Sequence, residues 1–218
     1  MLPILKEKIP APSPKAPSQK LASGLLDIDY FIDGGLAFNQ LTEWGIPWGS
    51  GGRSLILFFL AEATKRGYYS LWVYDRKDLL VYPPSWQAIG VDLKYLRVAV
   101  TSQVEKTKNA FTKTKKRGIY TKAIEDLKPA LMSPFFKVII IDSHIAPQDY
   151  AFLAQRARLQ KQLIFVLRKH HLSSRMGNVW AKCRFNSFRD PLSGRCYLRA
   201  LKGYSQRQMS YTLHGGAL

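Results

Sequence analysis

Between residues 24 and 170, short apolar runs alternate with longer segments in which apolar residues recur at helical spacing. Glycine, proline and aspartate bound the short runs, as is typical of buried strands. We expect strands at residues 41–44, 69–74, 96–100, 137–141 and 163–167, and helices at 53–65, 85–89, 103–131 and 148–160. This alternation predicts an α/β domain with a mainly parallel central sheet flanked by helices.

The pattern changes after residue 179. Residues 180–188, 195–202 and 208–214 alternate as antiparallel strands do, with a turn at 190–194. Residues 1–22 are rich in proline and lysine and lack apolar periodicity, which predicts a flexible basic tail. We therefore expect a single domain over residues 23–218, with the C-terminal strands at 179–214 included in it.

Composition narrows the class of protein. The chain has 218 residues, of which 46% are hydrophobic, so a wholly disordered chain is excluded. No apolar run approaches the ~18 residues that a membrane span requires. Cys183 and Cys196 are too few for a disulfide framework or a four-cysteine zinc site. We expect a protein of the reducing cytoplasm with no membrane partner.

Charge points to a polyanionic partner. The formal net charge is +18. Residues 150–218 contain thirteen Lys and Arg but one acid, Asp190, and so contribute +12 of this charge. A basic surface this uneven is typical of proteins that bind nucleic acid, although a basic surface that serves only solubility is the alternative.

A glycine-rich loop at residues 45–52 (GIPWGSGG) lies between a predicted strand and a predicted helix. Backbone N–H groups of such a loop can hold phosphate, and the pattern GxxxxGK(S/T) is the usual form. Here Pro47 replaces the first glycine and Arg53 the lysine. The alternative is a strand–helix turn without a ligand. The candidate nucleotide-binding residues in this degenerate loop are Gly49, Gly51, Gly52, Arg53 and Ser54.

An acid follows a second apolar strand. Residues 138–141 are Val-Ile-Ile-Ile, and Asp142 comes directly after them. This arrangement is typical of the Walker B motif, in which the aspartate holds Mg²⁺ directly or through water. We therefore add Asp142 to the nucleotide-binding set and assign it to Mg²⁺ only if nucleotide binds. A plain strand-capping aspartate is the alternative.

Taken together, these motifs resemble the RecA family. Its entry segment is similar to residues 24–29 (GLLDID), 34–36 (GGL) and 41–45 (LTEWG). The strand ending at Asp75, the turn at 90–93 (GVDL) and the Asp142-Ser143 pair follow in the family's order. The resemblance covers roughly residues 23–170 and implies a RecA-like P-loop core. It is closest to ImuA-like proteins, on the apolar helix after the loop, residues 83–86 (PPSW) and the short arginine-rich C-terminal region.

Several residues depart from the family's catalytic pattern. RecA proteins place a glutamate beyond the second core strand, but residues 75–78 here are Asp-Arg-Lys-Asp, and Asp78 could substitute only if the register slips. A later strand ends in Leu167-Arg168, where the family has Asn-Gln. With Arg53 and Pro47 also altered, we expect no competent ATPase and assign no catalytic residue. Binding of ATP and Mg²⁺ stays open.

The resemblance also implies a place for DNA, because in RecA-like folds the loops after the late strands face it. Residues 168–182 are polar and cationic, and residues 104–118 form a second basic segment. Phosphate contact is the functional interpretation of both, and a solvated surface is the alternative. The candidate DNA-binding residues are Arg168, Lys169, Arg175, Lys182, Lys113, Lys115, Lys116 and Arg117.

The resemblance implies a non-catalytic DNA-repair accessory protein of the SOS response, acting in translesion synthesis and associated with the nucleoid. Its partners would be DNA, a repair polymerase or Y-family-like protein, and RecA, with homo-oligomers left open. One alternative is a DNA-dependent P-loop ATPase of the recombinase type. Another is a regulator that binds RecA filaments.

Overall fold

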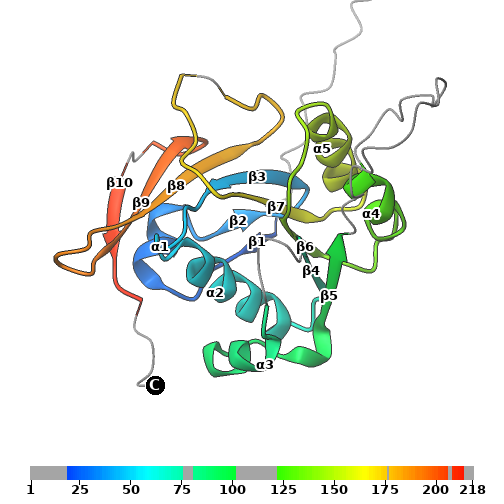
Figure 1. The fold of residues 1–218 in the computed structure, drawn as a ribbon. Coiled ribbons are helices and arrows are strands. Elements are labelled where there is room, and N and C mark those ends of the chain that lie inside the picture. Colours follow the sequence, from blue (N-terminus) through cyan, green and yellow to red (C-terminus); the bar gives the residue numbers. More distant parts are fainter. Residues whose placement is uncertain (1–18, 76–80, 102–121, 176, 206–207, 214–218) are drawn as a thin grey trace, which may run out of the picture.

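The computed structural model describes residues 19–75, 81–101, 122–175, 177–205 and 208–213. Their main feature is an eight-stranded sheet in the order β10-β9-β8-β3-β7-β6-β4-β5 (Figure 1). Its parallel strands are β3 (Gln40–Gly45), β4 (Ser70–Asp75), β5 (Leu96–Thr101), β6 (Val138–Asp142), β7 (Leu163–Arg168) and β8 (Cys183–Arg189). The antiparallel strands β9 (Cys196–Lys202) and β10 (Gln208–Tyr211) extend it at one edge.

Helices cover both faces of this sheet. On one face lie α1 (Leu26–Phe31), α2 (Gly52–Lys65), α3 (Pro83–Trp86) and the short helices η1 (Gln87–Ile89) and η2 (Leu93–Tyr95). On the other lie α4 (Lys122–Met132) and α5 (Asp149–Leu159). In β6, Val138 and Ile140 pack on the α2 side, while Ile139 and Ile141 pack on the α5 side. Burial on both faces explains why β6 is continuously apolar.

Aromatic side chains form the centre of the core under α2. The ring of Trp44 in β3 lies 4.4 Å from that of Phe185 in β8 and 6.1 Å from those of Phe59 in α2 and Phe165 in β7. The Trp44 indole N–H donates to the Thr42 hydroxyl over 2.9 Å, so its polar atom is satisfied within the core. This cluster fixes α2, and the loop before it, against the middle of the sheet.

The predicted fold is confirmed: an α/β domain with a mainly parallel sheet and antiparallel C-terminal strands. The five predicted central strands form, with ends that shift by one residue. Because β8 pairs parallel to β3, the C-terminal strands continue the main sheet. Of the basic helix predicted at 103–131, the segment before residue 122 lies outside the described residues.

The flexible tail was predicted to extend to residue 22, but ordered structure begins before that residue. Lys20 and Leu21, which we placed in the flexible tail, form strand β1 and pair with β2 (Leu36–Ala37). Leu21 is fully buried in the core under α2. Among the described helices, none has the length and apolar character needed to cross a membrane.

The contact between β1 and the glycine turn at residues 34–35 yields a stability test. Both glycines have positive φ, but a Cβ on Gly35 would lie 2.4 Å from the Leu21 carbonyl oxygen, while a Cβ on Gly34 would meet nothing within 4 Å. We expect Gly35→Ala to lower the free energy of unfolding by at least about 2 kcal/mol, and Gly34→Ala by only about 1 kcal/mol. Urea unfolding measures both, and equal losses would show that the Leu21 contact does not matter.

Candidate functional site

The glycine-rich loop runs from the end of β3 to the start of α2 and is packed tightly against the protein itself. A Cβ on Gly52 would lie 2.3 Å from Cγ2 of Ile46, and one on Gly51, where φ is 77°, would lie 2.7 Å from the sulfur of Cys196. The Ser187 hydroxyl donates to the Ser50 carbonyl over 2.8 Å. These contacts explain the glycines at 51 and 52 without invoking a phosphate.

Arg53, at the start of α2, pairs with Asp142 at the end of β6. The Arg53 Nε lies 3.0 Å from Oδ2 of Asp142, and its Nη2 lies 3.0 Å from Oδ1. Its Nη1 donates to the Ile46 carbonyl over 3.3 Å, and its guanidinium lies 4.1 Å from the centre of the Trp48 ring. The structure therefore brings together the two charged residues that the sequence assigned to nucleotide binding, but it pairs them with each other.

This pairing decides what the site can hold. A P-loop enzyme needs a cation free to contact phosphate and a carboxylate free to hold Mg²⁺. The Asp142 side chain is 1% exposed, and both of its oxygens accept from Arg53. A forked guanidinium matches a carboxylate well, so the pair is a stable alternative to ligand binding. In this arrangement the residues do not fit a Mg²⁺–nucleotide complex.

A second buried ion cluster lies beside the loop, centred on Glu43 of β3. Glu43 Oε2 accepts from Arg184 Nε over 3.0 Å, while its Oε1 accepts from the Tyr150 hydroxyl over 2.8 Å and from Arg168 Nε over 3.5 Å. Arg168 also donates to the Ile145 carbonyl over 3.1 Å. Burial raises the pKa of the Tyr150 phenol far above its ordinary value, so the hydroxyl stays a donor.

Sequence reasoning missed this cluster. Its signal was a lone glutamate in the apolar strand at 41–44 and an arginine, Arg184, within the predicted strand at 180–188. A charge within a buried strand is costly unless it is paired, so each implied a partner. The sequence could not say which residues pair, since Glu43 and Arg184 lie far apart in the chain and meet only where β3 and β8 run side by side.

The structure places Arg168, a predicted DNA contact, in an ion pair at the end of β7. Its side chain is 15% exposed and paired with Glu43, and its guanidinium lies 5.2 Å from the Tyr150 ring centre. To contact a phosphate, Arg168 would have to give up its ion pair with Glu43 and its hydrogen bond to the Ile145 carbonyl, while Glu43 would keep its contacts with Arg184 and Tyr150. Its guanidinium therefore makes contacts within the protein, and Arg168 also lines the cavity described next.

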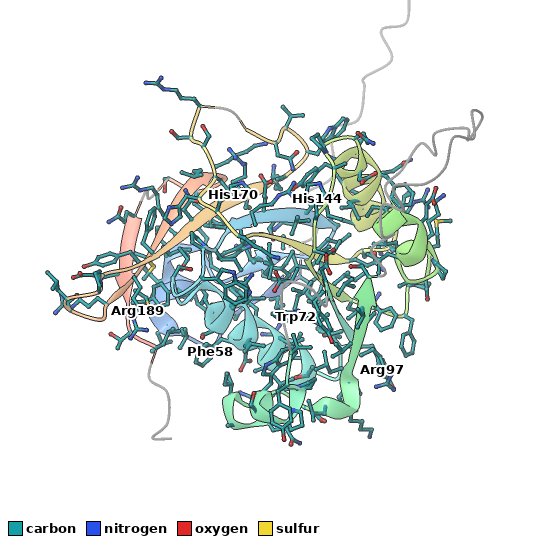
Figure 2. The ribbon with its side chains drawn as sticks, viewed as in Figure 1. Phe58, Trp72, Arg97, His144, His170 and Arg189 are labelled. Carbon is teal, nitrogen blue, oxygen red and sulfur yellow. The ribbon has the colours of Figure 1, made fainter. Side chains whose placement is uncertain are left out.

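Lys169, another predicted DNA-binding residue, lines a small cavity beyond the carboxyl ends of β6 and β7. The cavity has a volume of about 260 Å³, and its other lining residues are Ser143, His144, Leu167, Arg168 and His170. Figure 2 shows His144 and His170 at this edge of the sheet. The Ser143 hydroxyl is buried and has no hydrogen-bond partner among the described residues.

The remaining predicted DNA-binding residues do not gather at this cavity. Arg175 is exposed in the segment between β7 and β8. Lys182 is exposed at the opposite edge of the sheet, where its backbone N–H donates to the Leu41 carbonyl over 2.8 Å. Lys113, Lys115, Lys116 and Arg117 lie outside the described residues, as does Asp78.

Comparison with known proteins supports the fold and nothing finer. No protein-family model matches the sequence, and no curated protein matches it. Among solved structures, the RadB recombinase is similar, with a TM-score of 0.66 and 16% sequence identity over 89% of this chain and 96% of that one. The chain therefore has a RecA-like fold.

The Arg53–Asp142 pair yields a second stability test. Asp142→Asn would leave a largely buried guanidinium without its counter-charge, so we expect the free energy of unfolding to fall by about 3 kcal/mol. The exposed Asp27→Asn, which makes the same chemical change, should cost less than about 0.5 kcal/mol. In a double-mutant cycle, Arg53→Leu and Asp142→Leu should show a coupling of more than about 1 kcal/mol. Additive effects would contradict the pairing.

Proposed function

We propose that this chain is a non-catalytic, DNA-binding protein built on a RecA-like fold. The observation that carries the proposal is the bidentate pair between Arg53 and Asp142. It engages both of the charges that a P-loop ATPase directs at phosphate and metal. A protein that keeps the fold but pairs these two charges with each other is suited to binding and scaffolding. We propose that it binds its partners without ATP or Mg²⁺.

Two other departures from the RecA catalytic pattern, at Arg168 and Pro47, also support a non-catalytic protein. Arg168 stands where the resemblance to RecA places a glutamine that senses phosphate, and its guanidinium is held by Glu43. Pro47 provides no backbone N–H to a phosphate. Hydrolysis requires the metal, the cation and the water-orienting residue to act together, so the loss of several lowers the rate by orders of magnitude.

DNA is the proposed partner at the carboxyl edge of the sheet. The cavity there carries Lys169, two histidines and the unpartnered Ser143 hydroxyl, a set that suits a backbone phosphate. Arg175 extends the positive charge along the next segment. The net charge of +18 adds a long-range attraction that salt would screen.

For the biological setting, we propose an accessory role in DNA repair, in translesion synthesis of the SOS response. The support is the resemblance to ImuA-like members of the RecA family, carried by the apolar helix after the loop, residues 83–86 and the arginine-rich C-terminal region. One solved structure similar to this chain is itself a recombinase by name. A repair polymerase or Y-family-like protein, and RecA itself, are the proposed protein partners.

The ATPase alternative is tested directly. We expect the purified protein to show no ATP hydrolysis with or without single-stranded DNA, because Arg53 holds Asp142. An Arg53→Ala variant serves as the control, since it removes the residue that would have to replace the P-loop lysine. DNA-stimulated turnover in the wild type that disappears in this variant would overturn the proposal.

DNA binding is tested with one variant at the carboxyl edge, at Lys169, and one in the segment between β7 and β8, at Arg175. We expect Lys169→Glu and Arg175→Glu each to weaken binding of a fluorescein-labelled oligonucleotide by roughly tenfold at moderate salt. Lys94→Glu makes the same charge change on an exposed side chain of η2, before the amino end of β5, and should have a smaller effect. Fluorescence anisotropy measures all three. Equal losses would show that only the total charge matters, and binding insensitive to salt would contradict phosphate contact.

A further inference from the structure

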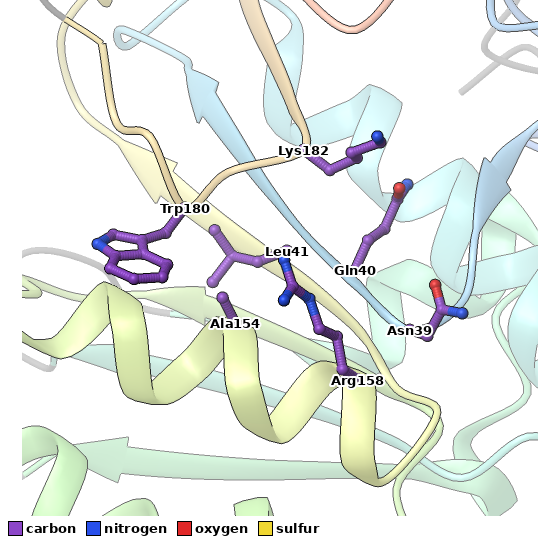
Figure 3. Close-up of a pocket in the computed structure, with 7 residues that line it drawn as sticks. All are labelled: Asn39, Gln40, Leu41, Ala154, Arg158, Trp180 and Lys182. Atoms are coloured by element: carbon purple, nitrogen blue, oxygen red, sulfur yellow. The ribbon is translucent and has the colours of Figure 1, made fainter. Parts of the chain in front are cut away.

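A second concave site lies at the opposite edge of the sheet from the glycine-rich loop. Its volume is about 290 Å³, and it is enclosed by the C-terminal half of α5, the start of β3 and the segment before β8 (Figure 3). Leu41, Ala154 and Trp180 form its apolar wall. Neither the nucleotide-binding interpretation nor the proposed DNA edge accounts for this site.

The segment that carries Trp180 is held in place by its own hydrogen bonds. The Asn178 side chain accepts from the Trp180 N–H over 3.0 Å, Lys202 Nζ donates to the Val179 carbonyl over 3.1 Å, and the Lys182 N–H donates to the Leu41 carbonyl. Even so, the Trp180 side chain is 47% exposed and that of Val179 is 77% exposed. A rigid segment that presents large apolar side chains to solvent is typical of a binding surface.

The polar side of the site is positively charged. Arg158 of α5 and Lys182 lie on either side of it, and neither has a carboxylate partner within the described portion of the chain (Figure 3). Gln40 also lines the cavity, and its buried Nε2 donor has no acceptor among the described residues. These donors match a carboxylate group.

An apolar groove continues from this cavity along α5. It has a volume of about 550 Å³ and shares Ala154, Arg158 and Trp180 with the first cavity. Phe152 and the 60% exposed Leu159 supply much of its apolar lining. Among the described residues that line either cavity, none is acidic.

We propose that this continuous surface binds a peptide segment of a partner protein in which apolar residues are followed by a carboxylate. The apolar residues would lie in the groove along α5, and the carboxylate would lie between Arg158 and Lys182. DNA is a poorer match, because its phosphates would leave the Leu159 and Phe152 side chains facing a charged backbone. Lys182, predicted from the sequence as a DNA contact, belongs to this peptide site.

The test uses a pair of short fluorescein-labelled peptides and the full chain. One peptide has apolar residues followed by two aspartates, and the other ends in two asparagines instead. We expect the aspartate peptide to bind more tightly, and Arg158→Glu and Trp180→Ala each to weaken it by roughly tenfold. Arg195→Glu makes the same charge change as Arg158→Glu on an exposed residue of the β8–β9 turn and should have little effect.

Three results would overturn the proposal: no binding of either peptide, equal binding of both, or variants that behave like Arg195→Glu. Thermal unfolding would confirm that both variants fold, as their exposed positions lead us to expect. Labelled DNA is measured in parallel. If Trp180→Ala weakens DNA binding as much as peptide binding, the surface belongs to DNA instead. DNA binding proposed above depends on Lys169 and Arg175, so either proposal can fail without the other.

Discussion

The ion pair between Arg53 and Asp142 links the first turn of α2 to the end of β6, and the surrounding loop is arranged around it. The same guanidinium contacts the Ile46 carbonyl and lies against the Trp48 ring, so a single side chain contacts the first half of the loop at two points. Close packing of Gly51 and Gly52 against Cys196 and Ile46 completes the arrangement. In P-loop enzymes the corresponding loop holds phosphate, whereas here the Arg53–Asp142 pair occupies it.

Glu43 has a comparable role deeper in the sheet. A carboxylate buried in β3 is tolerable only because Arg184, Arg168 and Tyr150 satisfy it from three other elements. Arg168 and Tyr150 lie on β7 and α5, the strand and helix that bound the two proposed binding edges. Arg168 also lines the cavity at the carboxyl edge, so the cluster links that edge of the sheet to its buried centre.

The two edges differ in chemistry, which is why we assign them to different partners. At the carboxyl edge, Lys169, the histidines and Ser143 surround a small polar cavity. At the amino edge, two cations adjoin a longer apolar groove beside Trp180 and Leu159. A phosphate backbone suits the first, whereas the second requires a ligand that has both apolar and acidic groups. Parallel strands separate the edges, so both can be used at once.

The sequence by itself determined the fold class and the order of the strands and helices along the chain, and it predicted a polyanionic partner, because periodicity and net charge are local or additive properties. It also identified Arg53 and Asp142, but as residues for a ligand. Only the tertiary structure decided that they bind each other, that Arg168 pairs with Glu43, and that Lys182 lies apart from Lys169. These outcomes depend on which strands are neighbours and on which side chains meet across them, and sequence spacing does not encode such distances.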